Sequence, residues 1–181
     1  MAAARRSLVT HAQLGAGWTA GATPKKVGML ACTAPTSLKG VLETGAVVSP
    51  TYRASTAGPF LSASAFVYDS PAGAARFFAQ IAKPNALTCL AQSLATGKSS
   101  SGVVFTVTSR QTLRPPRVGA SAVAVRVVGR ATISAQKVTV YADVILLQRG
   151  STIEQLSFAS FATAVPAATE ARIARAAATR L

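Results

Sequence analysis

Apolar and other side chains alternate along much of the second half of the chain, a pattern typical of β-strands. Residues 102–109, 121–129 and 138–161 carry this period, as in "SAVAVRVVG" and "VTVYADVILLQRGSTIEQLSF". A period of two places alternate side chains on one face of a strand. The pair Arg149-Gly150 divides the last segment into the two strands of a hairpin. Strands joined by such short loops predict a mainly antiparallel sheet.

Helical spacing predicts a helix directly after an extended segment over residues 52–68. Ser70 is a good N-cap residue, and Pro71 fits the first helical position. The helix then places four apolar residues on one face: Ala74, Phe77, Phe78 and Ile81. The same spacing predicts a second helix over residues 85–95, and residues 7–13 predict a short helix near the start of the chain.

The end of the chain predicts a C-terminal helix that Pro166 opens. Its apolar stripe is rich in alanine and comprises Ala167, Ala171, Ala174 and Ala178, with Ile173 and Ala177 nearby. Residues 110–119, "RQTLRPPRVG", are predicted to be a linker, because their two prolines exclude a central strand.

The order of these elements is helix, strands, two helices, four strands and a last helix, which predicts the α+β class. We expect a mainly antiparallel β-sheet of about five to six strands packed with helices, with the C-terminal helix closing the domain. Residues 1–27 are predicted to form a short helix and a loop. Residues 28–181 are predicted to form a single α+β domain, for which the chain of 181 residues is long enough.

Asp143 is the acidic residue that most resembles a reactive group, because it lies in mid-strand among partly apolar neighbours. Carboxylate chemistry also needs a partner: a second acid, a histidine or a metal. Glu154 lies across the hairpin turn near the opposite end, and His11, the only histidine, is near the start of the chain. The structural interpretation is that Asp143 pairs with an arginine such as Arg126 on the neighbouring strand, or caps loop amides.

Other catalytic and cofactor motifs are absent from the sequence. One histidine and two cysteines do not make the usual four-ligand zinc site. The chain has no GxGxxG, P-loop or GxSxG motif. We therefore predict no catalytic, metal-binding or cofactor-binding residue and no cofactor, and a hydrolase of unrecognised type is the remaining enzymatic alternative.

The charge balance is strongly basic, with 19 Lys and Arg against 5 acids and a net charge of +14. Such a charge attracts polyanions, yet the basic residues are spread out, and the aromatic residues that interleave in single-strand binding sites are scarce. Two interpretations stay open: a solvated basic surface, or a specific anion-binding face. No apolar run approaches the roughly 18 residues of a membrane span, so no transmembrane segment is predicted.

Cys32 and Cys89 are the two cysteines of the chain. Their neighbours are apolar in both cases, "MLAC" and "LTCLA". From the residues alone, they are either buried small side chains or the two halves of one disulfide.

Four segments together resemble a known family. They are "SLVTHAQLGAGWT" with a cysteine soon after, "SASAFVYDSPAGAARFF", "VILLQRGSTIEQLSF", and the end rich in Arg and Ala. The layout resembles the secreted sensor-like domains of actinobacterial envelope lipoproteins and of the extracellular part of mycobacterial Ser/Thr kinases. Kinase-linked members typically carry two cysteine pairs, where this chain has one. The resemblance implies an α+β sandwich, export, no known catalysis, and a disulfide between Cys32 and Cys89.

We therefore expect a non-enzymatic, lipoprotein-like domain in the cell envelope or outside the cell, with its export signal or anchor outside the residues given. It is expected to bind an unknown small-molecule or protein ligand in a cleft beside the sheet. The candidate cleft-lining residues are Trp18, Tyr52, Arg126, Tyr141 and Asp143. The alternative is a basic protein that binds an anionic polymer, such as nucleic acid or an acidic cell-wall polymer. If the basic surface is only solvated, weak polymer binding that salt abolishes is expected.

Overall fold

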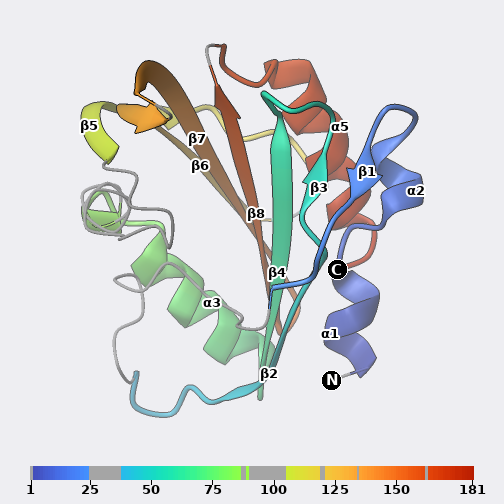
Figure 1. The fold of residues 1–181 in the computed structure, drawn as a ribbon. Helices are drawn as coiled ribbons and strands as arrows, with labels where there is room; N and C mark the ends of the chain where they lie inside the picture. The colour runs from blue at the N-terminus through green and yellow to red at the C-terminus, as the bar shows by residue number, and fades with distance from the viewer. Residues whose placement is uncertain are drawn as a thin grey trace.

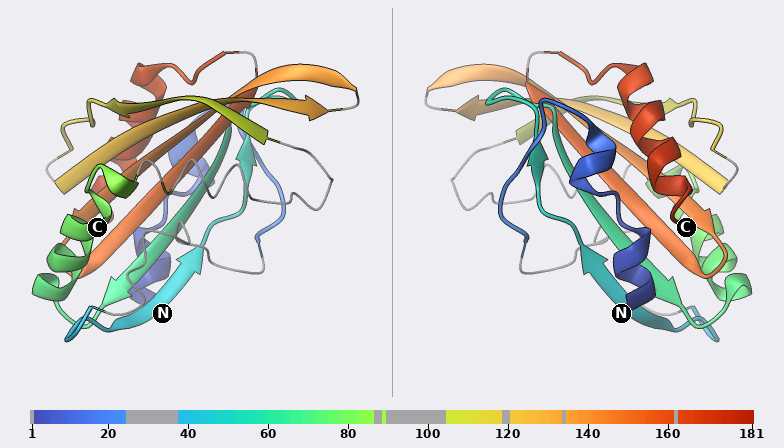
Figure 2. Two further views of the ribbon diagram at one scale, coloured as in Figure 1. Left: turned by 90° about the vertical axis from the view of Figure 1, so that its left-hand side faces the viewer. Right: turned by 90° about the vertical axis from the view of Figure 1, so that its right-hand side faces the viewer.

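A twisted antiparallel sheet lies between two helical layers. The computed structural model describes residues 2–24, 38–86, 89, 105–118, 121–133, 135–161 and 163–181. Figures 1 and 2 show helix α3 on one face of the sheet, and helices α1, α2 and α5 on the opposite face. The helices span α1 Ala2–Ser7, α2 His11–Leu14, α3 Pro71–Ile81 and α5 Ala167–Ala178.

The described residues form eight strands, and all of their pairings are antiparallel. The order is β1-β3-β4-β8-β7-β6-β5, and β2 also pairs with β4. Strands β5 to β8 follow one another in the chain and in the sheet, while β4 lies against β8 (Figure 1). The strands span β1 Thr19–Ala20, β2 Glu43–Val48, β3 Tyr52–Arg53, β4 Phe60–Tyr68, β5 Phe105–Leu113, β6 Ser121–Ile133, β7 Gln136–Arg149 and β8 Thr152–Phe161.

The predicted α+β class, antiparallel sheet and C-terminal helix are confirmed, but the predicted five to six strands are too few. Strand β1 has two residues, which is too short to show an alternating pattern, and no strand was predicted over β2, Glu43–Val48. Strand β5 also continues to Leu113, so the predicted linker over residues 110–119 is wrong in its first part. The two prolines follow the end of β5, which is an edge strand of the sheet.

Helix α3 begins and packs as predicted. The hydroxyl oxygen of Ser70 accepts a hydrogen bond from the Gly73 backbone N–H at 3.0 Å, and Pro71 is the first helical residue. The four predicted apolar residues are buried against the sheet. The short helix predicted over residues 7–13 is instead two helices, α1 and α2, separated by Leu8, Val9 and Thr10.

Each face of the sheet carries its own apolar cluster. On β7, Val144 and Leu146 pack in the cluster around α3, while Ile145 and Leu147 pack in the cluster that contains α5. The alternation in the sequence therefore reflects a strand with helices on both sides, because both sets of alternate residues are apolar.

Two predictions fall on residues that the structure does not describe. The helix predicted over residues 85–95 lies mostly outside the described residues. Cys32 also lies outside them, so its disulfide with Cys89 stays a prediction.

Candidate ligand-binding cleft

A cleft of about 320 Å³ opens between the first turns of α5 and the sheet. We call it the α5 cleft. Its wall is largely apolar, and three of its lining residues carry ionisable groups: Arg114, Arg126 and Glu170. The lining residues are Leu113, Arg114, Pro116, Ala124, Arg126, Ile145, Val165, Ala167, Glu170 and Ala171. A small-molecule site of this kind combines apolar walls with a few polar groups that fix orientation.

The charged part of the α5 cleft begins with a buried ion pair across β6 and β7. The register of the two strands places Arg126 directly opposite Asp143. Nε of Arg126 donates to Oδ1 at 2.6 Å and Nη2 donates to Oδ2 at 2.7 Å, a two-pronged contact. Asp143 is fully buried, and its hydrogen bond raises the pKa of Arg126. The predicted pairing of Asp143 with an arginine such as Arg126 is therefore confirmed.

A third charged residue, Glu170, joins this pair from the first turn of α5. Oε1 of Glu170 lies 3.7 Å from Nη2 of Arg126, and the residue is only 5% exposed. This oxygen makes no hydrogen bond to any residue that the structure describes. The sequence analysis considered Glu154 as the second acid for Asp143, whereas the acid that joins the ion pair in the structure is Glu170.

The ionisation of Glu170 depends on its surroundings in the cleft. Burial raises its pKa from 4.5 to about 8, and the neighbouring carboxylate of Asp143 adds to this effect. The positive charge of Arg126 acts in the opposite direction. At neutral pH, Glu170 therefore keeps its proton.

The sequence did contain a signal for Glu170. The buried face of α5 consists of Glu170, Ile173, Ala174, Ala177 and Ala178, so the acid occupies an i, i+3, i+4 position relative to the core residues. Four members of the predicted stripe, Ile173, Ala174, Ala177 and Ala178, are on this buried face, but the stripe included Ala167 in place of Glu170, and Ala167 is exposed where it lines the cleft. An acid in line with an apolar helical stripe is the pattern that would have found it.

The α5 helix also begins at the cleft. Its N-cap residue is Pro166, whose side chain makes no capping hydrogen bond. The next residue, Ala167, lines the cleft. The positive end of the helix dipole therefore adds to the field of Arg126 and Arg114.

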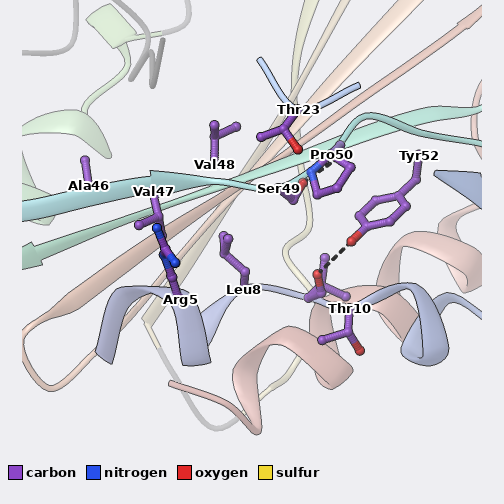
Figure 3. Close-up of a pocket in the computed structure, with 11 residues that line it drawn as sticks. Arg5, Leu8, Thr10, Thr23, Ala46, Val47, Val48, Ser49, Pro50 and Tyr52 are labelled. Atoms are coloured by element: carbon purple, nitrogen blue, oxygen red, sulfur yellow. Dashed lines mark hydrogen bonds between the residues drawn. The ribbon is translucent and has the colours of Figure 1, made fainter. Parts of the chain in front are cut away.

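A second hollow, of about 510 Å³, lies between α1 and strand β2 (Figure 3). We call it the α1 groove. Tyr52 is the predicted site residue that lines it, and its hydroxyl lies 3.5 Å from the carbonyl oxygen of Val9. Its charged lining residue, Arg5, is exposed. In contrast to the α5 cleft, no buried carboxyl or guanidinium group lines the α1 groove among the described residues.

The other predicted site residues do not gather in one place. Trp18 is buried in the core cluster that contains α5, and it lines neither hollow. Tyr141 is half-buried on β7. Asp143 lies beneath the α5 cleft without lining it, so Arg126 is the predicted site residue that does line this cleft. The five predicted residues are thus divided among the core, the α1 groove and the α5 cleft.

Glu154 is a further buried carboxyl, on β8 opposite Leu147. Oε1 accepts a hydrogen bond from the backbone N–H of Val9 at 3.2 Å, while Oε2 has no hydrogen-bond partner among the described residues. Burial raises the pKa of Glu154 from 4.5 to about 8, against the opposing effects of the Val9 N–H and the charge of Arg180. Glu154 lines neither hollow.

No family model, curated protein or solved structure matches this chain. The resemblance to secreted sensor-like domains therefore stays a prediction. In the part of the chain that the structure describes, no three His, Cys, Asp or Glu side chains are grouped to hold a metal ion. None of the described helices is both long and apolar enough to cross a membrane.

Proposed function

We propose that this protein is a non-enzymatic binding domain that holds a small ligand in the α5 cleft. The observation that carries the proposal is the buried group of Arg126, Asp143 and Glu170 below a cleft with apolar walls. Burying charged groups lowers the stability of the fold, and a ligand that forms polar contacts with them offsets part of this loss. The α1 groove has no such group among its described residues.

Binding is favoured over catalysis because of how the carboxyl groups are used. Both oxygens of Asp143 accept hydrogen bonds from Arg126, and Asp143 does not line the cleft. Glu170 is the one acid among the lining residues, and none of them carries a hydroxyl, thiol, amine or imidazole group. A nucleophile and a general base within hydrogen-bond reach of each other, as covalent catalysis requires, are therefore not provided by the lining residues.

The proposed setting is the cell envelope, with a sensor-like role. The support for it is the sequence resemblance. The disulfide that this resemblance implies would persist in an oxidising compartment of this kind.

The experiment is an amide NMR titration with prodan, an uncharged apolar dye. We expect saturable shifts at Leu113, Arg114 and Ala171, and loss of these shifts in Ala167→Trp, whose indole would occupy the mouth of the cleft. The matched control is Ala168→Trp, because Ala168 is the next exposed residue of the helix and does not line the cleft. Shifts confined to the α1 groove, or equal binding in both variants, would overturn the proposal.

The second candidate function is binding to an anionic polymer, and the net charge of +14 favours it. Polymer binding should weaken steeply as salt rises, whereas binding in an apolar cleft should not. Sub-micromolar binding to duplex DNA at physiological salt would favour this second function, because non-specific contacts typically give about 10⁻⁴–10⁻⁶ M.

A further inference from the structure

We infer that the ligand of the α5 cleft is an amphipathic monoanion, an apolar chain or ring with a carboxylate-type head group, and that the protonated form of Glu170 accepts it. This inference rests on the proposed function and adds the chemical class of the ligand and its link to a proton.

The apolar part of the ligand follows from the cleft wall. Seven of the ten lining residues are Leu, Ile, Val, Pro or Ala, contributed by the end of β5, by β6 and β7, and by the start of α5. The volume of about 320 Å³ is at the lower end of the range for small-molecule sites. The cleft thus suits one short apolar group whose surface leaves water on binding.

The negative head group follows from the polar groups that remain available. Asp143 occupies Nε of Arg126 and one position on Nη2, and no hydrogen bond from Nη1 is found within the described part of the chain. A guanidinium carries five N–H donors, so Nη1 has two donors left for an anion. Arg114 adds an exposed positive charge at the same cleft, and the start of α5 adds the positive end of its dipole.

The proton on Glu170 decides whether an anion is tolerated. Charged and titratable groups act on this cluster from three elements: Asp143 and Tyr141 from β7, Arg126 from β6, and Arg114 from the residue after β5. With Glu170 neutral, Arg126 and Asp143 balance each other, and an anion meets the uncompensated charge of Arg114. With Glu170 ionised, the cluster carries a net negative charge, which repels the anion at short range.

The sign of the pH dependence follows from this balance. The ligand binds the protonated cleft, so the affinity is full below the pKa of Glu170, which burial raises to about 8, and falls above it. Once the pH exceeds that pKa, the affinity falls by up to about tenfold for each further pH unit. A cationic ligand of the same shape would show the opposite dependence.

The test compares three probes with the same eight-carbon chain: octanoate, octanol and octylammonium. Their affinities are measured by isothermal titration calorimetry at pH 6.5 and pH 9.5, where octanoate and octylammonium each keep one charge state. We expect octanoate to bind most tightly at pH 6.5 and to lose at least about tenfold in affinity at pH 9.5. Calorimetry in buffers of different ionisation enthalpy should show proton uptake by the wild-type protein when octanoate binds near pH 8.5.

Two buried glutamates give a matched pair of variants. Glu170→Gln keeps a neutral side chain with an N–H donor at the cleft, so octanoate should bind it equally at both pH values. Glu154→Gln removes the other carboxyl whose pKa burial raises to about 8, away from the cleft, and should retain the pH dependence of the wild type. The proton-uptake measurement uses the wild type alone. It therefore tests the link between octanoate binding and protonation even where a variant does not fold.

The outcomes separate this inference from the proposed function. Equal affinities for octanoate and octanol, or tighter binding of octylammonium at pH 9.5, would overturn the anion while leaving cleft binding in place. A pH dependence that persists in Glu170→Gln, or that disappears in Glu154→Gln, would overturn the role of Glu170. Failure of all three probes to bind overturns the inference, and failure of prodan in addition overturns the proposed function.

Discussion

The Glu154→Gln substitution is expected to change how the stability of the fold depends on pH. Glu154 is fully buried, and one of its carboxyl oxygens has no hydrogen-bond partner among the described residues. Burial raises its pKa from 4.5 to about 8 in the folded protein. The folded state therefore holds a proton that the unfolded chain has already lost. The stabilising contribution is fully present below about pH 4.5 and is lost as the pH rises through about 8.

The size of the effect follows from that interval. For each pH unit over which only the folded state holds the proton, the free energy of unfolding falls by about 1.4 kcal/mol. The interval from 4.5 to about 8 sets an upper limit of about 5 kcal/mol on the loss. From pH 5 upward about three of these units remain, and relaxation and water entry around a buried charge reduce such penalties, so we expect a loss of about 2–4 kcal/mol between pH 5 and pH 9. Glutamine cannot ionise, and it retains the oxygen that accepts the Val9 N–H.

Urea unfolding followed by the emission of Trp18 measures this difference. Trp18 is the one tryptophan in the chain and is 8% exposed, so its emission reports loss of the core. The free energy of unfolding should fall less steeply with pH in Glu154→Gln than in the wild type. Glu170→Gln should remove a second part of the slope, because its pKa is raised as well. Parallel curves for wild type and Glu154→Gln would refute the reasoning.

Three further predictions concern packing and covalent structure. Asp143→Asn should lower the free energy of unfolding by about 3–5 kcal/mol, because Arg126 would lose its buried counter-charge; an unchanged thermal midpoint would contradict this. Gly129→Ala would place a methyl carbon 2.7 Å from the carbonyl oxygen of Thr106 and should cost about 1–3 kcal/mol in urea unfolding, whereas wild-type stability would show that β5 moves freely. Maleimide labelling of unreduced, denatured protein from an oxidising host should find no free thiol, and two labelled cysteines would exclude the predicted disulfide.

The sequence predicted best those elements whose signals are local. Ser70 and Pro71 mark the start of α3 within two residues, and the alternation around Asp143 assigns every side chain of β7 to a face. The ion pair with Arg126 needed one more fact, the register of β6 against β7. That register depends on where the hairpin turn forms, and Ala135 adopts a positive φ of 65° there, which its residue type does not suggest.

The cleft itself was beyond local patterns. Glu170 is separated from Arg126 by more than forty positions in the sequence, and only the packing of α5 on the sheet brings them together. Acids on helices usually face solvent, so the residue type predicted exposure. Trp18 and Tyr52 were candidates because aromatic residues often line sites, yet Trp18 is in the core and Tyr52 lines the α1 groove.

The pairing of β4 with β8 has a consequence for the route by which the chain folds. Strands β5 to β8 pair with their neighbours in sequence, so each hairpin closes a short loop. In contrast, Phe60 pairs with Ala159 and Val67 with Thr152, so these partners are about 90 residues apart. Strands that are this far apart in the sequence pair slowly, because the chain loses conformational entropy in closing the long loop before the contacts between the strands form. We expect strands β5 to β8 to pair first, and the docking of β4 against β8 to limit the folding rate.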